Sequence, residues 1–147
     1  MNGRFPAAVA IVALFALAAC RREAQAPLAQ LAPLERDGRM EWAGMQPCAD
    51  CDGIQTRLVL ARDGGDRGFV LTETFLAAQP VRFVARGSWE RDGALLRLHA
   101  QDGARYGYVV LADGGLQPRD MRGHRLATSD GDGLLLPLDD AAATAAR

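Results

Sequence analysis

The chain has 147 residues and a formal net charge of −1, with 49% hydrophobic and 24% charged residues. This length favours a single domain, and the composition is typical of a globular protein. Nothing in it indicates a nucleic-acid-binding surface, which would need basic side chains clustered on one face.

The N-terminal stretch, residues 1–19, is predicted to be an export signal. Arg4 supplies a short positive segment, and an apolar run then extends from Phe5 to Ala19, where small residues close it. The run is shorter than the roughly 20 apolar residues that a membrane-spanning helix needs. We therefore expect a cleaved signal peptide rather than an uncleaved membrane anchor.

The motif L-A-A-C, which ends at Cys20, resembles a bacterial lipobox. The resemblance implies that Cys20 becomes the first residue of the mature chain and carries lipid on its sulfur and its amine. Stable anchoring needs more than one acyl chain, since each buried CH₂ contributes about 0.8 kcal/mol. By the usual sorting pattern of such lipoproteins, an Asp directly after the lipidated Cys argues against transfer to the outer membrane. Here that position is occupied by Arg21. The expected location is therefore the outer membrane, with the domain facing the periplasm or the cell surface.

Residues 20–38 are predicted to form a lipidated, flexible tether. Ala, Gln and Pro dominate this stretch, and no strand-like alternation occurs in it. Leucines recur every three residues up to Leu34, which allows a short helical turn, but Pro27 and Pro33 argue against a long helix. A flexible spacer between the lipid and the domain is the better interpretation.

From residue 39 the sequence alternates apolar and polar residues in short segments that Gly and Asp separate. Alternation with a period of two is typical of strands that bury one face. Asp-Gly pairs between such segments, as at Asp92-Gly93 and Asp102-Gly103, are strong hairpin signals. The residues expected to face inward are Ile54, Thr56, Leu58, Leu60, Phe69, Leu71, Phe75, Val81, Phe83, Ala85 and Trp89.

Charged residues in these segments carry two further expectations. Arg82 and Arg86 alternate onto the outer face. Glu73 shares the inward face, where a buried carboxylate would need a partner such as Arg57 or Arg105. The alternative is that Glu73 lies at a solvated end of the fold.

Consecutive hairpins form a meander, and a meander with one apolar face must curl or close to bury that face. We therefore predict an all-β fold, a small antiparallel up-and-down barrel or half-barrel of about six to eight strands. The barrel is expected over residues 39–139, with residues 140–147 as a disordered tail.

Cys48 and Cys51 form a C-x-x-C motif, with Asp50 inside it and Asp52 directly after it. A disulfide across so short a loop stabilises the fold by about 2 kcal/mol in the chain-entropy model. A thioredoxin-like catalyst instead needs a helix N-terminus or a nearby cation to stabilise the thiolate. Here a strand is expected to follow, and the two carboxylates disfavour a thiolate. The sequence therefore argues against dithiol catalysis.

Metal binding by the reduced pair is a third interpretation. Zinc normally takes four ligands, and with Cys20 acylated only two thiols and the chain's two histidines remain. Copper(I) accepts thiolate and thioether ligands. Met45 extends the motif to M-x-x-C-x-x-C. Cys48, Cys51 and Met45 are therefore candidate copper(I) ligands, in the reduced form only.

The expected compartment decides the resting state of the pair. An exported chain meets an oxidising periplasm, in which two neighbouring cysteines close. The default expectation is a Cys48–Cys51 disulfide that remains reducible. Oxidation would abolish metal binding, because a disulfide offers no thiolates.

Residues 42–60, W-A-G-M-Q-P-C-A-D-C-D-G-I-Q-T-R-L-V-L, resemble the opening of the NlpE N-terminal domain family of copper-resistance and envelope-stress lipoproteins. Residues 68–75 resemble the family's next strand, and residues 87–98 resemble its G-x-W and G-x-L-x-L segment. Residues 116–123 are a weaker match. The specific part is the core P-C-A-D-C-x-G-I.

The resemblance implies a lipocalin-like small barrel on an outer-membrane lipid anchor. It also implies a role in copper handling or in surface and envelope-stress sensing, with an envelope-stress sensor kinase as a partner. Cys48 and Cys51 take the family's C-x-x-C position. The best-known member has a second, C-terminal domain with its own cysteine pair, whereas this chain is expected to be a single-domain short form. A role that depends on the second pair is not carried over.

No Ser/His/Asp arrangement, carboxylate pair at helical spacing or phosphate-binding Gly loop occurs in the sequence. We therefore expect no enzyme activity and no required cofactor, with copper as the candidate metal. The leading interpretation is a lipid-anchored sensor or binding module whose cysteine pair reports redox state or copper. The alternatives are a carrier of a small apolar ligand, which would need a large open cavity, and a structural envelope lipoprotein.

Overall fold

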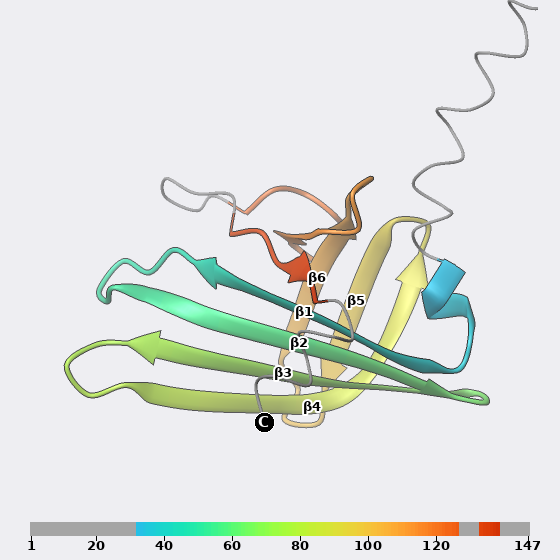
Figure 1. The fold of residues 1–147 in the computed structure, drawn as a ribbon, viewed down its shortest axis with the longest axis horizontal. Coiled ribbons are helices and arrows are strands. Elements are labelled where there is room, and N and C mark those ends of the chain that lie inside the picture. Colours follow the sequence, from blue (N-terminus) through green and yellow to red (C-terminus); the bar gives the residue numbers. More distant parts are fainter. Residues whose placement is uncertain (1–31, 127–132, 139–147) are drawn as a thin grey trace, which may run out of the picture.

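The structure, a computed structural model, describes residues 32–126 and 133–138. These residues form one antiparallel sheet that curls into a nearly closed barrel (Figure 1), as predicted. In chain order the elements are the 3-10 turn η1 (Ala32–Glu35) and the strands β1 (Gly38–Gln46), β2 (Gly53–Asp63), β3 (Asp66–Leu76), β4 (Val81–Asp92), β5 (Leu95–Ala100), β6 (Arg105–Val110), β7 (Leu116–Arg119) and β8 (Leu136–Pro137).

The strand order is β7-β6-β5-β4-β3-β2-β1-β8, so neighbours in the sequence are neighbours in the sheet from β1 to β7. This is the predicted meander. The short strand β8 returns to the free edge of β1. Leu116 and Leu135 then exchange two backbone hydrogen bonds of 2.8 and 2.9 Å, which join the two ends of the sheet. The barrel therefore closes through one short seam.

In β2, β3 and β4 the core contains residues that the alternation placed on the inner face, namely Thr56, Leu58, Leu60, Phe69, Leu71 and Trp89. Leu58 pairs with Leu71 across β2 and β3, and Trp89 pairs with Leu98 across β4 and β5. The largest fully buried side chains are Trp42, Leu58, Leu60, Leu71, Leu96, Leu98, Leu116, Leu135 and Thr56. Leucines and aromatic side chains, among them Trp42 and Trp89, thus fill the interior.

Val81 and Phe83 lie on the predicted face but are not buried, with 50% and 57% of their surface exposed. The reason is the length of the neighbouring strand. β3 pairs with β4 from Val81 onward, whereas β5 pairs with β4 only from Gly87. The left-hand ends of β1–β4 in Figure 1 therefore extend beyond the rest of the barrel and leave this end open.

The opposite end of the barrel is covered by η1. Leu34 is 5% exposed and belongs to the core cluster. Glu35 forms an ion pair with Arg91 of β4. The predicted tether therefore overlaps the folded domain, because burial of the Leu34 side chain and this ion pair hold the turn against the barrel.

Several predictions fall on residues that the structure does not describe. The signal peptide over residues 1–19, lipidation at Cys20 and the tail over residues 140–147 all lie outside the described ranges. Within residues 32–126 and 133–138, no helix is long and apolar enough to cross a membrane.

Candidate functional site at the open end of the barrel

The C-x-x-C motif lies in the loop of residues 47–52, which joins β1 to β2 at the open end. The Asp52 backbone N–H donates a 2.9 Å hydrogen bond to the Leu76 carbonyl oxygen, at the end of β3. The loop therefore lies beside the hairpin that joins β3 to β4, and Figure 1 shows both at the same end of the molecule.

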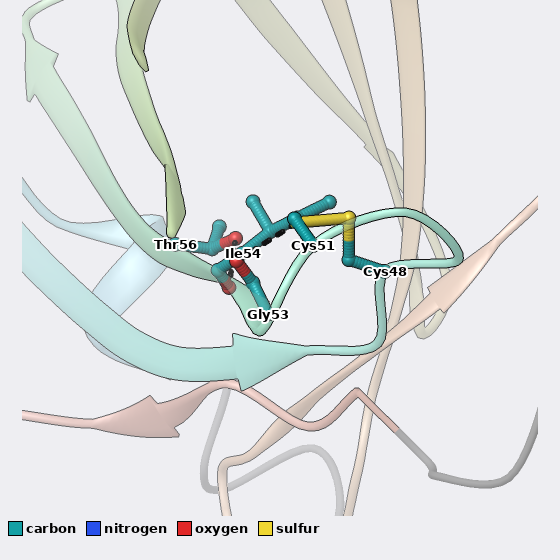
Figure 2. Close-up of a disulfide and its surroundings, with 5 residues drawn as sticks. All are labelled: Cys48, Cys51, Gly53, Ile54 and Thr56. Atoms are coloured by element: carbon teal, nitrogen blue, oxygen red, sulfur yellow. Dashed lines mark hydrogen bonds between the residues drawn. A yellow bond between two sulfur atoms is a disulfide. The ribbon is translucent and has the colours of Figure 1, made fainter. Parts of the chain in front are cut away.

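Cys48 and Cys51 are joined by a disulfide, with their Cα atoms 5.4 Å apart (Figure 2). Both residues are half-buried, whereas Asp50 and Asp52 are exposed. The Cys51 sulfur lies 3.3 Å from the Gly53 carbonyl oxygen. A disulfide sulfur carries no proton, so this contact becomes a hydrogen bond only after reduction, when the Cys51 thiol can donate.

The surroundings of the pair do not favour a reactive thiolate. The loop leads directly into strand β2, as the sequence predicted. In the described part of the chain the one helical element is η1, which contacts β1 at the barrel end opposite this loop. A helix N-terminus that would stabilise a thiolate is therefore absent from the described surroundings of the pair.

Gly53 fixes the geometry of the loop where β2 begins. Its φ of +147° is a conformation that residues with a side chain rarely adopt. A Cβ atom at this position would lie 2.8 Å from the Met45 sulfur. The Met45 thioether therefore packs directly on Gly53, two residues from Cys51, and 53% of the Met45 surface remains exposed.

The two histidines lie away from this loop, in local polar contacts of their own. The His99 Nε2 atom is 3.3 Å from Glu90, and the His124 Nδ1 atom is 3.0 Å from Asp120. Within the residues that the structure describes, no group of three or more His, Cys, Asp or Glu side chains could hold a metal ion. The donor set at the loop is thus two cysteine sulfurs with a nearby thioether.

The mouth of the barrel, next to the loop, is a hollow of about 330 Å³ whose lining includes Glu73, Arg105, Tyr106 and Tyr108. Burial raises the pKa of Glu73 above its ordinary value. Burial, together with the nearby Glu73 carboxylate, raises the pKa of Tyr108 as well. The Glu73 carboxyl and the Tyr108 hydroxyl at the mouth therefore both favour their neutral forms more than they would in water.

Arg57, one of the two partners suggested for a buried Glu73, does not pair with it. Arg57 lies opposite Thr72 and so on the outer face, where it forms an ion pair with Glu41. Burial by itself would raise the pKa of Glu41, but the guanidinium groups of Arg57 and Arg39 lower it overall. Thr56 lies opposite Glu73, and successive residues of a strand point to opposite faces. The Arg57 side chain therefore lies on the other face of the sheet from Glu73.

We expect the change in the free energy of unfolding caused by Glu73→Gln to be more favourable at pH 7 than at pH 3.5. The folded state raises the pKa of Glu73, so it binds the proton more tightly than the unfolded state does. The resulting contribution of Glu73 to the free energy of unfolding is favourable and complete below the unfolded-state pKa. It is lost as the pH rises through the folded-state pKa. Urea unfolding of both proteins at the two pH values measures this, and a pH-independent difference would contradict it.

Glu41, Tyr106 and Tyr108 were not among the predicted site residues. A signal for the tyrosines was present, since the stretch R-Y-G-Y over residues 105–108 places both on one face of a strand. For Glu41 the sequence held no comparable signal. The Leu138 N–H, directly after β8, donates to the Glu41 carbonyl oxygen at 2.8 Å.

Fold and site together define a small, nearly closed antiparallel barrel with a disulfide-bridged C-x-x-C loop at its open end. A family model described as the NlpE N-terminal domain matches residues 42–129. The chain is 34% identical over 114 residues to Lipoprotein NlpE of Escherichia coli strain K12, an alignment that covers 72% of this chain and 45% of the relative. The chain therefore belongs to the NlpE N-terminal domain family.

A solved structure supports this assignment. The crystal structure of the Cpx pathway activator NlpE from Escherichia coli matches with a TM-score of 0.54 and 33% identity, over 63% of this chain and 47% of that chain. The chain thus spans less than half the length of the relatives to which it is similar.

Proposed function

We propose that this chain is a lipid-anchored envelope lipoprotein that takes part in envelope-stress sensing through its Cys48–Cys51 pair. The observation that carries the proposal is the disulfide on a partly exposed loop at the rim of the barrel, in a chain similar to a Cpx pathway activator. Neither cysteine belongs to the packed core, so a change of oxidation state acts on the loop first. The proposed partner is an envelope-stress sensor kinase, and the proposed location is the outer membrane.

A binding and signalling role fits the site better than catalysis. An efficient dithiol enzyme stabilises its thiolate with a helix N-terminus or a cation. Here the residues flanking the pair are the exposed carboxylates Asp50 and Asp52, and the nearest acceptor for a reduced Cys51 thiol is the Gly53 carbonyl oxygen. These groups favour a protonated thiol, so we propose that the pair responds to its environment rather than turning over a substrate.

The reduced pair has a donor set that suits copper(I). Two cysteine sulfurs lie in one short loop, and the exposed Met45 thioether packs on Gly53 beside it. Soft thiolate and thioether ligands select copper(I). Zinc, which normally takes four ligands, would find too few in the described part of the loop's surroundings. We propose copper(I) binding by the reduced form, with Cys48 and Cys51 as the main ligands.

The reduced full-length chain is expected to bind one copper(I) ion, whereas the oxidised chain is expected to bind none. Competition with bicinchoninate under anaerobic conditions measures the stoichiometry and the affinity. Cys48→Ser/Cys51→Ser should abolish binding, because both thiolates are lost. Met45→Leu should weaken binding about tenfold, which corresponds to about 1.4 kcal/mol.

Two controls separate this site from unspecific binding. His99→Ala removes a histidine that pairs with Glu90 outside the loop, and it should leave the affinity unchanged. Copper(I) binding by the double serine variant with an affinity close to that of the parent would contradict the proposed ligands. In that case the cysteine pair could still act as a redox switch.

Lipidation at Cys20 is a separate part of the proposal. Cys20→Ala is expected to abolish labelling by palmitate and to release the protein from the membrane fraction, because the acyl chains supply the anchoring free energy. Cys48→Ala serves as the matched control and should remain labelled. A Cys20→Ala protein that stayed fully membrane-bound would contradict the anchor.

A carrier of small apolar ligands is the less favoured function. Such a carrier needs an open interior, whereas here the interior is filled by fully buried leucines and Trp42. The hollow of about 330 Å³ lies at the mouth and contains Glu73 and Arg105 on its wall. The filled interior therefore favours a surface-based role.

A further inference from the structure

The first half of β4 has a free edge. β3 pairs with β4 along Val81–Ser88, but on the other side β5 begins to pair only at Gly87. The last hydrogen bond on that side runs from the Gln101 N–H to the Arg86 carbonyl oxygen, at 2.9 Å. Among the described residues, no strand covers the stretch 81–85 on this side.

The direction of the backbone groups along this edge follows from the pleat. In an antiparallel ladder, alternate residues direct their N–H and C=O groups to opposite sides of the strand. Because Arg86 bonds toward β5, the backbone groups of Arg82 and Val84 also point toward the open edge. Phe83 and Ala85 bond toward β3. The edge thus offers two N–H and two C=O groups to an incoming strand.

The inner side of this edge is apolar. Val81 and Phe83 are about half exposed. The ring of Phe83 packs edge-on against Phe75 of β3, with ring centroids 5.4 Å apart. The Phe75–Phe83 pair therefore forms an apolar shelf beside the mouth of the barrel, and an added strand would cover it.

The outer side of the edge is basic. Arg82 and Arg86 are exposed, and Val84 between them is 39% exposed. Neither arginine forms an ion pair with any residue in the described part of the chain. An incoming strand would place two of its side chains directly opposite these guanidinium groups. The charge of those side chains therefore decides whether the strand is attracted or repelled.

A second copy of this chain is a poor occupant. If two β4 edges paired symmetrically over the whole segment, Val84 would face Val84, and each Arg82 would face the Arg86 of the other copy. Like charges directly opposite one another destabilise a strand pair. The two arginines therefore oppose self-pairing, a common protection of exposed edges, and they favour an acidic partner.

We propose that the edge of β4 over residues 81–86 binds an extended protein segment that adds a strand to the sheet. The segment carries acidic side chains four positions apart, opposite Arg82 and Arg86, and apolar side chains that cover Phe83. Backbone hydrogen bonds supply the general affinity of such strand addition, and side-chain contacts supply its specificity. This inference goes beyond the proposed function, since the cysteines form no part of the surface.

The test uses the exported full-length chain in detergent and two synthetic peptides, S-E-V-T-V-E-S and S-K-V-T-V-K-S, blocked at both ends. Fluorescence anisotropy measures binding, and hydrogen exchange locates it. The acidic peptide is expected to bind and to protect the amides of Arg82 and Val84. In Arg82→Glu/Arg86→Glu the preference should reverse, with each affinity changing by about tenfold.

Two further variants complete the test. Arg122→Glu/Arg125→Glu makes the same change in net charge at exposed residues in the segment after β7, outside the edge of residues 81–86, and it should leave both affinities unchanged. Val84→Pro removes one edge N–H that β3 does not use, and it should abolish binding of the acidic peptide. If this proline variant fails to fold, the charge reversal still decides the question.

Several results would overturn the proposal. These are the absence of binding by the acidic peptide, equal binding of both peptides, or protection confined to another part of the chain. Protection of Arg82 and Val84 that rises with protein concentration alone would show self-association instead. Binding to phosphatidylglycerol vesicles that disappears in Phe83→Ser, without peptide binding, would identify the surface as a membrane contact.

Discussion

Gly87→Ala is expected to destabilise the domain by about 3 kcal/mol or more, at the upper end of the range for overpacking. A Cβ atom at this position would lie 2.0 Å from the His99 carbonyl oxygen and 2.9 Å from the Ala100 Cα. Both neighbours are backbone atoms of β5, which cannot move without breaking the pairing of β4 with β5. The urea midpoint of unfolding measures the loss.

Gly68→Ala is the matched control for this prediction. Gly68 lies in β3, close to Gly87, but a Cβ atom on it would meet its nearest neighbour at 3.9 Å, an ordinary contact. We expect its stability to stay within about 1 kcal/mol of the parent, because Gly and Ala differ by that amount in regular structure. Equal effects of the two substitutions would contradict the close approach of the β5 backbone to Gly87.

Trp42→Ala is expected to destabilise the domain by about 3–5 kcal/mol, the range for deleting a large buried aromatic side chain. Trp42 is 1% exposed and lies opposite Leu58 of β2 and Pro137 of β8. Its indole N–H donates a 2.9 Å hydrogen bond to the Gly114 carbonyl oxygen, in the turn before β7. The side chain therefore joins both sides of the seam that closes the barrel.

Trp42→Phe separates the two contributions of this side chain. It keeps an aromatic ring in the core but removes the donor to Gly114, and we expect it to lose about 1–2 kcal/mol. Thermal unfolding of both variants provides the measurement. If Trp42→Ala were as stable as Trp42→Phe, the packing of the indole would contribute little, and closure of the barrel would depend on other contacts.

The local signals in the sequence predicted the strands and turns well, because they act over a few residues. Alternation identified the inner face of β2, where Thr56, Leu58 and Leu60 are all buried. The Asp-Gly signals at Gly93 and Gly103 correspond to turns in which both glycines have positive φ. These features follow from the pleat and from the steric freedom of glycine, which a single sequence shows directly.

The open end of the barrel was not predictable in the same way. Alternation placed Phe83 on the inner face correctly, but its exposure depends on the point where β5 starts to pair with β4. The ion pair of Arg57 with Glu41 depends on the register of β1 against β2, and the burial of Leu34 depends on a turn that folds back over the core. Each is a tertiary relation, so the sequence pattern of one segment does not contain it.

Within the candidate site, the cysteine pair was predictable and its surroundings were not. Proximity in the sequence and the expected compartment predicted the disulfide that the structure contains. The contact of Met45 with Gly53 and the hydrogen bond from Asp52 to Leu76 tie the loop to both neighbouring strands. A change in the loop on reduction would therefore reach the β3–β4 hairpin, next to the free edge of β4.

The most direct measurement is the oxidation state of Cys48 and Cys51 in the exported, full-length protein, by iodoacetamide alkylation and mass spectrometry with and without copper stress. Without reductant and without copper stress, we predict a peptide two hydrogen masses lighter than the dithiol and free of alkylation. Prior reduction should add two labels. Two freely alkylated thiols in the untreated protein would contradict a resting disulfide, and with it the redox response proposed for this loop.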